Sequence, residues 1–285
     1  MDARQALTHI SNLLKTHGIE DPQDEARILL CHTVGITPAR LFSSPEAMLT
    51  DSQQNLLDEL AARRIRHEPT SYITEKKEFY GLEFYVNHNV LIPRPETELL
   101  VEQAILVSRQ MVFLDTKRKI TIADIGTGCG AIAISIARNV DVDIYAVDLS
   151  KDALEVAGCN CQRHGVSDKI HLLQGNLLEL IPRPVDIIVA NLPYISSAEM
   201  KTLDLEILSF EPLQALDGGT DGTDKIEELL RTSIPHLAMD GTVILEFGYN
   251  QRYLIERLID RYLPGSRRSF FRDLAGLDRA VSIFV

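Results

Sequence analysis

The sequence has few cysteines and no long apolar run. Its four cysteines are spread over 285 residues, a usage too sparse for a disulfide framework. No stretch approaches the roughly 18 apolar residues that a membrane-spanning helix needs. The N-terminal residues also lack the apolar core of a signal peptide. These absences predict a cytoplasmic protein that has no membrane partner.

Positive charge is also scarce. The chain carries 29 Lys and Arg residues against 41 Asp and Glu residues, a formal net charge of -12. Basic residues gather only in two short clusters, at 63–66 and 267–268. Nucleic-acid phosphates repel an acidic chain unless its basic residues share one face. We therefore expect no direct DNA binding. A basic partner or a small substrate fits this net charge better than a long duplex. For the oligomeric state, a monomer is the default expectation.

Apolar spacing divides the chain into a helical part and an alternating part. We expect a helical domain over 1–70, a β-hairpin linker over 71–92 and an α/β domain over 93–285. In the last part, strands alternate with helices, which favours a mostly parallel sheet with helices on both faces. The expected strands are 119–125, 143–147, 170–174, 185–190, 242–247 and 280–285; the expected helices are 97–110, 130–139, 152–164, 224–236 and 250–262.

A glycine-rich loop lies between the first of these strands and the following helix. Glycines at this position allow a tight turn and let a ligand approach the main chain closely. The loop reads G-x-G-x-G and has an acid two residues before its first glycine, which differs from the G-x-G-x-x-G of dinucleotide-binding proteins. The candidate cofactor-contacting residues here are Asp124, Gly126, Thr127, Gly128, Cys129 and Gly130.

Two later strand ends add further candidates. Asp148 ends the second strand, where a carboxylate can accept both hydrogen bonds of a ribose diol; the alternative is a helix N-cap. Asn176 and Leu177 follow the third strand. The Asn176 side-chain oxygen can accept a bond from an adenine amino group. Together with the glycine loop, these positions resemble class I methyltransferases, which implies S-adenosylmethionine as the cofactor and S-adenosylhomocysteine as its product.

The segment Asn191-Leu192-Pro193-Tyr194 follows the fourth strand and resembles the N-P-P-Y loop of amino-methylating enzymes. An amide nitrogen is a poor nucleophile, so its NH2 group must be aligned and given hydrogen-bond acceptors. The Asn191 side chain and the backbone carbonyl of Leu192 can accept its two N–H groups. Pro193 fixes the turn, and Tyr194 offers a flat face for a planar amide. Leu192 stands where the family has proline, and that change keeps the carbonyl.

Several further motifs resemble the HemK/PrmC family, which methylates a glutamine in class I peptide release factors. They include residues 79–84, 91–98, 210–222, 245–248 and 273–279, so the resemblance covers most of 70–285. It implies that the helical domain helps to hold the release factor and that the catalytic domain takes its Gly-Gly-Gln loop. It also implies that Asn191 contributes to the cofactor site, and that a loop closes over the site through Arg94, Pro95, Glu96 and Thr97.

Other functions remain open from the sequence alone. A ribosomal protein could be the glutamine-bearing substrate, or adenine N6 in DNA could be methylated after base flipping. A binding module that kept the fold without catalysis is a third alternative. We predict no metal site, because Cys159 and Cys161 lie inside a helical stretch without a matching histidine pair.

Overall fold

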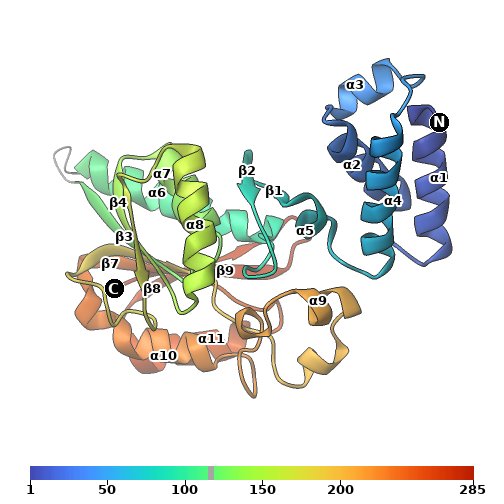
Figure 1. Ribbon diagram of the computed structural model, residues 1–285. Helices are drawn as coiled ribbons and strands as arrows, with labels where there is room; N and C mark the ends of the chain where they lie inside the picture. The colour runs from blue at the N-terminus through green and yellow to red at the C-terminus, as the bar shows by residue number, and fades with distance from the viewer. Residues whose placement is uncertain (115–118) are drawn as a thin grey trace. The chain divides into compact units, whose positions relative to one another are not determined.

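The computed structural model describes residues 1–114 and 119–285, which form two compact units. The helical unit comprises Met1–Lys76 and Asp204–Phe210, and the α/β unit comprises Lys77–Leu203 and Glu211–Val285. Within the described ranges, no helix is long and apolar enough to cross a bilayer. Figure 1 shows the elements of both units along the chain.

Helix ends in the helical unit are set by local side chains. Asp2 with Gln5, and Thr50 with Gln53, form reciprocal capping boxes at the starts of two helices. Pro22 opens another, as its sequence position predicts. The helices are α1 (Ala3–Thr16), α2 (Pro22–Val34), α3 (Pro38–Ser43), α4 (Asp51–Ile65), α5 (Thr70–Thr74) and α9 (Leu205–Phe210).

The helical unit has its own apolar core, and one buried ion-pair centre joins distant segments. Leucines and alanines of α1, α2 and α4 face one another in this core. The Arg64 guanidinium lies 3.2 Å from Glu25 and 2.9 Å from Glu206, and only 6% of its side chain is exposed. Because Glu206 belongs to α9, this arginine explains why 204–210 belongs to the helical unit.

The α/β unit is built on a seven-stranded sheet in the order β5-β4-β3-β6-β7-β9-β8. The first five strands in this order pair in parallel, and β9 is antiparallel to both of its neighbours. The strands are β3 (Ile120–Ile125), β4 (Val142–Asp148), β5 (Ile170–Gln174), β6 (Val185–Ala190), β7 (Leu237–Glu246), β8 (Arg267–Arg272) and β9 (Asp278–Phe284). This confirms the expected mostly parallel sheet.

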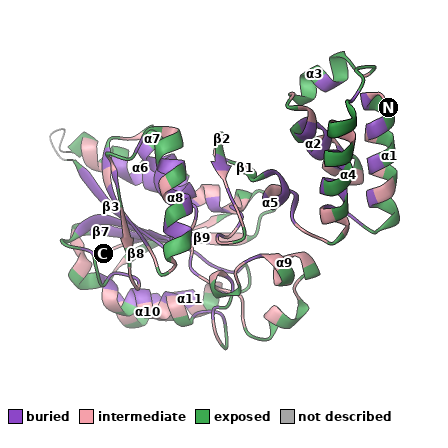
Figure 2. Ribbon diagram, in the orientation of Figure 1, coloured by how far each residue is buried: buried purple, intermediate pink, exposed green. Residues whose placement is uncertain are grey.

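Helices cover both faces of this sheet. Figure 1 shows α10 and α11 on the face opposite α6 and α7. β3 (Figure 2) and β6 are buried along their whole length, which explains their continuous apolar runs. The helices are α6 (Glu98–Leu114), α7 (Ala131–Asn139), α8 (Lys151–His164), α10 (Asp224–Ser233) and α11 (Arg252–Tyr262), with short 3-10 turns η1 (Pro95–Thr97), η2 (Glu199–Thr202), η3 (Leu213–Ala215) and η4 (Ile234–His236).

A two-stranded hairpin, β1 (Lys76–Phe79) and β2 (Leu82–Tyr85), precedes the large sheet. Its two turn residues, Tyr80 and Gly81, both have positive φ, as a tight hairpin turn requires. Buried Asn160 of α8 exchanges two hydrogen bonds with the backbone of Tyr85 and donates a third to the Cys129 carbonyl. The hairpin is therefore fixed to α8 by Asn160, the residue between the two cysteines of that helix.

Candidate active site

The sheet changes direction between β3 and β6, and ligands bind at the carboxyl ends of strands at such a point. From β3 the chain proceeds through β4 to β5, and then returns to place β6 on the other side of β3. Asp148 is the last residue of β4, and the glycine loop, Asn176 and Asn191 follow the carboxyl ends of neighbouring strands. The topology thus brings four separate sequence signals to one edge.

The glycine loop leaves β3 through left-handed backbone conformations. Gly126 has φ of 75°, and a Cβ there would lie 3.4 Å from the Leu192 side chain and 3.5 Å from the Asn191 carbonyl. The amides of Gly126 and Thr127 both donate to the Val147 carbonyl, at 2.9 and 3.0 Å. The loop is therefore pressed against β4 on one side and the 191–192 segment on the other.

Asp124 lies beneath this loop and is fully buried. Its Oδ2 accepts hydrogen bonds from the Thr127 hydroxyl at 2.7 Å and from the Ala133 amide at 3.2 Å. Burial raises the pKa of Asp124 to about 7, against the opposing effect of these two donors. Burial also raises the pKa of Cys129 to about 12, so its thiol stays protonated at neutral pH. The buried Asp124 carboxylate therefore joins the glycine loop, through Thr127, to the first turn of α7, through Ala133.

Asp148 binds the glycine loop directly. Its Oδ2 accepts from the Gly128 amide and its Oδ1 accepts from the Ser150 amide, both at 2.9 Å. The N-cap of α8 is Ser150, whose hydroxyl accepts from the Ala153 amide, so Asp148 is not the helix cap. Burial raises its pKa, and the backbone donors lower it. The carboxylate has acceptor capacity left for a ligand diol.

Asn176 is oriented by an acid from α10. Its Nδ2 donates to Glu228 Oε1 at 3.1 Å, and Lys225 Nζ lies 2.9 Å from Glu228 Oε2. With its NH2 group engaged, the Asn176 side-chain oxygen is available as an acceptor. The neighbouring Leu177 has φ of 46° although it is not glycine, and strain of this kind clusters at ligand sites.

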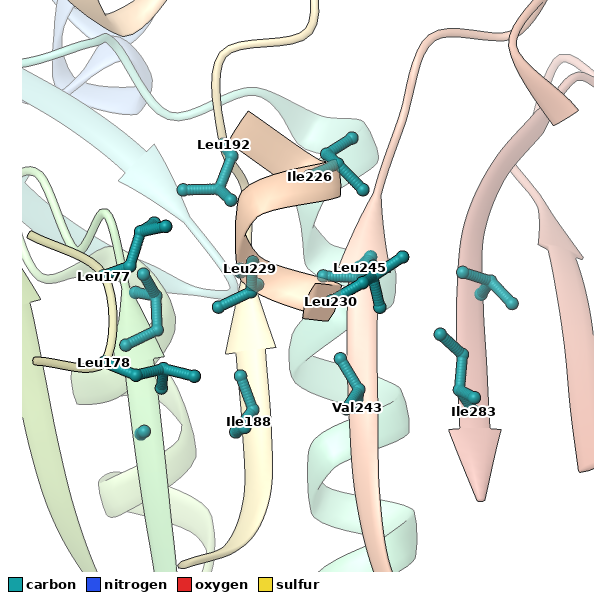
Figure 3. Close-up of a cluster of buried hydrophobic side chains, with 14 of the residues drawn as sticks. Leu177, Leu178, Ile188, Leu192, Ile226, Leu229, Leu230, Val243, Leu245 and Ile283 are labelled. Atoms are coloured by element: carbon teal, nitrogen blue, oxygen red, sulfur yellow. The ribbon is translucent and has the colours of Figure 1, made fainter. Parts of the chain in front are cut away.

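Asn191 follows β6, and a hydrogen bond to Thr97 orients its side chain. Its Nδ2 donates to the Thr97 hydroxyl at 3.0 Å, which leaves its Oδ1 as a possible acceptor for a ligand. Leu192 is 6% exposed and joins the apolar cluster on the α10 side of the sheet. Figure 3 shows its side chain among the residues of this cluster, which also contains Leu177 and Leu229.

Tyr194 is fixed at both its hydroxyl and its backbone. The hydroxyl donates to Glu246 Oε1 at 3.0 Å, and the carbonyl accepts from Gln251 Nε2 at 2.8 Å. Glu246 ends β7 and is 1% exposed. Burial and the adjacent Glu246 both raise the pKa of Tyr194, so the phenol remains protonated.

A glycine-rich segment, 216–222, packs directly against the backbone of 193–197. The Gly218 amide donates to the Ile195 carbonyl at 2.8 Å, and the Ile195 amide donates to the Leu216 carbonyl at 3.1 Å. A Cβ on Gly218 would lie 2.7 Å from the Pro193 carbonyl, and one on Gly222 would lie 2.2 Å from the Tyr194 carbonyl. Glycine at positions 218 and 222 therefore lets the two backbone segments approach more closely than a Cβ atom would allow.

These elements line an open cavity of about 370 Å³ in the α/β unit. Of the residues expected from sequence, those that line it are Gly126, Gly128, Asp148, Asn176, Leu177, Asn191, Leu192 and Pro193. Asp124, Thr127, Cys129, Gly130 and Tyr194 are not among the lining residues. Sequence reasoning did not single out Asn89, Val90, Ser150, Gly175, Gln214 and Lys225, which are among the other lining residues.

The segment 94–97 does not contribute to the cavity lining. Arg94 pairs with buried Glu211 at 2.5 Å, and Glu211 also accepts from the Ile92 amide at 3.2 Å. Thr97 is 5% exposed, and its hydroxyl accepts a hydrogen bond from Asn191, which lines the cavity. Thr97 therefore contacts a residue of the cavity wall, and closure of 94–97 over the site stays a prediction.

Two supporting acids, Glu246 and Glu228, were also missed as functional residues. Glu246 lies in one of the family-like motifs, and an acid that ends an apolar strand is the signal that could have marked it. Glu228 carries no such signal, because acids on the polar face of a helix are common. Only the fold brings it next to Asn176.

Comparisons with known proteins identify related families and proteins for both parts of the chain. A family model of the PrmC N-terminal domain matches residues 5–74, and one of the methyltransferase small domain matches 104–220. The release factor glutamine methyltransferase of Bradyrhizobium diazoefficiens is 36% identical over 270 residues, covering 94% of this chain and 90% of that protein. The protein of the same name from Gloeobacter violaceus is 37% identical, covering 84% and 82%.

A solved methyltransferase from Pyrococcus furiosus shares the fold. Its TM-score is 0.51 at 19% identity, and the match covers 72% of this chain and 88% of that chain. At this level of identity the likeness concerns the fold alone.

Proposed function

Because the chain belongs to the family of release factor glutamine methyltransferases, we propose that it methylates the glutamine side-chain amide in the Gly-Gly-Gln motif of class I peptide release factors. The methyl donor in this proposal is S-adenosylmethionine. The single observation that carries the proposal is the side chain of Asn191. Its NH2 group is engaged by Thr97, and its oxygen remains as an acceptor beside the cavity.

The residues of the cavity fit S-adenosylmethionine. Asp148 offers carboxylate oxygens suited to a ribose diol, and Asn176 offers an amide oxygen suited to an adenine amino group. The glycine loop presents backbone without side chains along one wall, so a ligand can approach it closely. When bound, the cofactor supplies a methyl group activated by a positively charged sulfur.

The 191–194 segment would bind the substrate amide. Asn191 Oδ1 and the Leu192 carbonyl would each accept one of its N–H groups, and this favours positive charge that develops on nitrogen. Pro193 limits the backbone freedom of the turn. The Tyr194 ring, fixed through its hydroxyl, would pack on the amide plane. Methylation makes the nitrogen acidic enough to lose its proton to water, so none of these residues must act as a base.

The helical unit has a separate core and would help to hold the release factor. Residues 5–74 match the family model of the PrmC N-terminal domain, and this match supports a role of the helical unit in binding the release factor. Since release factors work on ribosomes, we propose that the enzyme acts in the cytoplasm.

A methyl-transfer assay with three acceptors tests the proposal. The protein would be incubated with labelled S-adenosylmethionine and either a class I release factor, a purified ribosomal protein fraction or adenine-bearing DNA. Label should enter the release factor and be lost when its Gly-Gly-Gln glutamine is replaced. Label in ribosomal protein or DNA, with none in the release factor, would contradict the assignment.

A further inference from the structure

Asn176 and Lys225 line the cavity from different elements and share one acid. Asn176 follows β5, and Lys225 lies in the first turn of α10. The Asn176 Nδ2 donates to Glu228 Oε1 at 3.1 Å, and the Lys225 Nζ donates to Glu228 Oε2 at 2.9 Å. One carboxylate therefore holds an amide and an ammonium group next to each other at the cavity wall.

Apolar packing fixes the backbone that carries these side chains. Leu177 and Leu229, the chain neighbours of Asn176 and Glu228, belong to one buried cluster on the α10 side of the sheet (Figure 3). Leu177 is 7% exposed, and Leu229 is fully buried. Because both neighbours are held in this core, Glu228 is kept within hydrogen-bond distance of Asn176.

The charge of Glu228 decides which end of the Asn176 amide is free. An ionised carboxylate can only accept hydrogen bonds, whereas an amide has a donor end and an acceptor end. The Lys225 and Asn176 donors hold the pKa of Glu228 below its usual value, so the carboxyl group is ionised at neutral pH. A second carboxylate oxygen, Oε1 of Glu179, lies 3.5 Å from the same Asn176 nitrogen. The NH2 group therefore faces these acids, and the amide oxygen is free.

The cavity wall thus offers one acceptor and one donor whose roles are fixed. The acceptor is the Asn176 oxygen, and the donor is the Lys225 ammonium group, which has three protons and gives one to Glu228. Adenine carries the complementary pair, an amino donor at N6 next to an acceptor at N1. A 6-oxo purine carries the reverse pair, an acceptor at O6 next to a donor at N1.

We propose that Glu228 determines the nucleobase specificity of the cofactor site, by orienting Asn176 as an acceptor and holding Lys225 as a donor for one edge of adenine. The inference rests on the proposed function, because it takes S-adenosylmethionine as the ligand of this cavity. A 6-oxo purine would place acceptor against acceptor and donor against donor. Glu228 is not among the lining residues, so it is a positioning residue that acts through its two partners.

The test compares the binding of S-adenosylhomocysteine with that of S-inosylhomocysteine, its 6-oxo counterpart. Isothermal titration calorimetry on the full chain gives both dissociation constants without a methyl acceptor. The wild type should bind the adenosyl compound at least about 30-fold more tightly, because two hydrogen bonds are mismatched in the other. In Glu228→Gln, the new NH2 group can donate to the Asn176 oxygen and so turn the Asn176 NH2 group toward the ligand. The preference should then fall to less than about 5-fold.

An exchange of the two side-chain types should restore the preference. In the double variant Asn176→Asp with Glu228→Gln, the new carboxylate at position 176 can accept from position 228 and from adenine at once. Its preference should return to within about 3-fold of the wild-type ratio, at unchanged net charge. Glu227→Gln is the matched control, since Glu227 lies in the same helix but accepts from Tyr262 and Arg261. It should keep the wild-type ratio.

Equal binding of the two compounds by the wild type would overturn the inference and leave the cofactor site in place. An unchanged ratio in folded Glu228→Gln, whatever its affinity, would also overturn it, as would a double variant that does not recover. If neither compound binds to the wild type, the inference and the cofactor assignment fail together. Selective binding by a protein that methylates no release factor would support the role of Glu228 and contradict only the proposed acceptor.

Discussion

At the scale of residues, the polar groups that line the cavity are oriented by partners outside it. Glu228 engages the NH2 group of Asn176, and Thr97 engages that of Asn191. In both cases the amide oxygen is left for a ligand. Sequence reasoning predicted both asparagines from their places after strands. It could not predict the partners, because Thr97 and Glu228 are far from the two asparagines in the chain.

Leu192 shows why a departure from the family pattern can be tolerated. Its side chain is buried in the apolar cluster, so it adds packing where the family has proline. We predict that Leu192→Pro keeps methyl transfer, since only the backbone carbonyl is used, but lowers the free energy of unfolding by about 1–3 kcal/mol. Turnover and denaturant unfolding would be measured together. A folded variant without any turnover would contradict the role given to the carbonyl.

Asp124 should make stability depend on pH. Its pKa is about 3.9 in an unfolded chain and about 7 in the folded protein. Between these values the folded state keeps a proton that the unfolded state has lost. The free energy of unfolding contributed by this group therefore falls as pH rises from about 4 to 7.

Asp124→Asn removes this titration. We predict that the melting temperature of the variant minus that of the wild type increases as the pH is raised from 5 to 8. Thermal melts at both pH values would measure the difference, and taking it against the wild type cancels the other titrating groups. A difference that does not change with pH would show that Asp124 does not titrate in this range.

At the scale of elements, strands with strong apolar patterns were predicted well, and polar ones were not. β5 and β6 have the bounds expected from sequence, 170–174 and 185–190. β8 was missed because it is an edge strand with exposed arginines, so its pattern resembles a loop. The short helix α9 was missed because it is stabilised by a distant arginine, Arg64, rather than by its own six residues.

The segment 216–222 was expected only from family resemblance, and the structure gives its physical reason. We predict that Gly222→Ala disrupts the 193–197 backbone, because its Cβ would lie 2.2 Å from the Tyr194 carbonyl. Methyl transfer should fall at least about 10-fold, and thermal stability should also fall. Gly265→Ala is the matched control, since Gly265 has a similar φ of 84° but no atom near its Cβ position.

The control variant should show only the cost of a left-handed alanine, about 1 kcal/mol. Both proteins would be compared by thermal melting and by turnover. Equal losses in the two variants would mean that backbone strain alone, rather than contact with Tyr194, explains the glycine at position 222.

At the scale of the whole molecule, composition and alternation predicted the α/β fold and a helical N-terminal part. The acidic net charge predicts weak binding to long nucleic acids, and this stays a prediction. Sequence could not predict that 204–210 belongs to the helical unit, because that membership depends on ion pairs between segments far apart in the chain.

The cavity should make the whole protein more stable when S-adenosylmethionine is present. At about 100 times its dissociation constant, the ligand should add about 2.7 kcal/mol to the free energy of unfolding. At the same ligand concentration, Asp148→Ala should show a smaller gain, because the proposed diol acceptor is lost and the dissociation constant rises. Denaturant unfolding with and without ligand would measure it, and no gain in the wild type would argue against the cofactor site.

The most direct test of the account is mass spectrometry of a class I release factor treated with this protein and S-adenosylmethionine. We predict a gain of one methyl group on the glutamine of the Gly-Gly-Gln motif, and no gain with folded Asn191→Ala. An unmodified glutamine after treatment with the wild type, or full methylation by Asn191→Ala, would contradict the central claim.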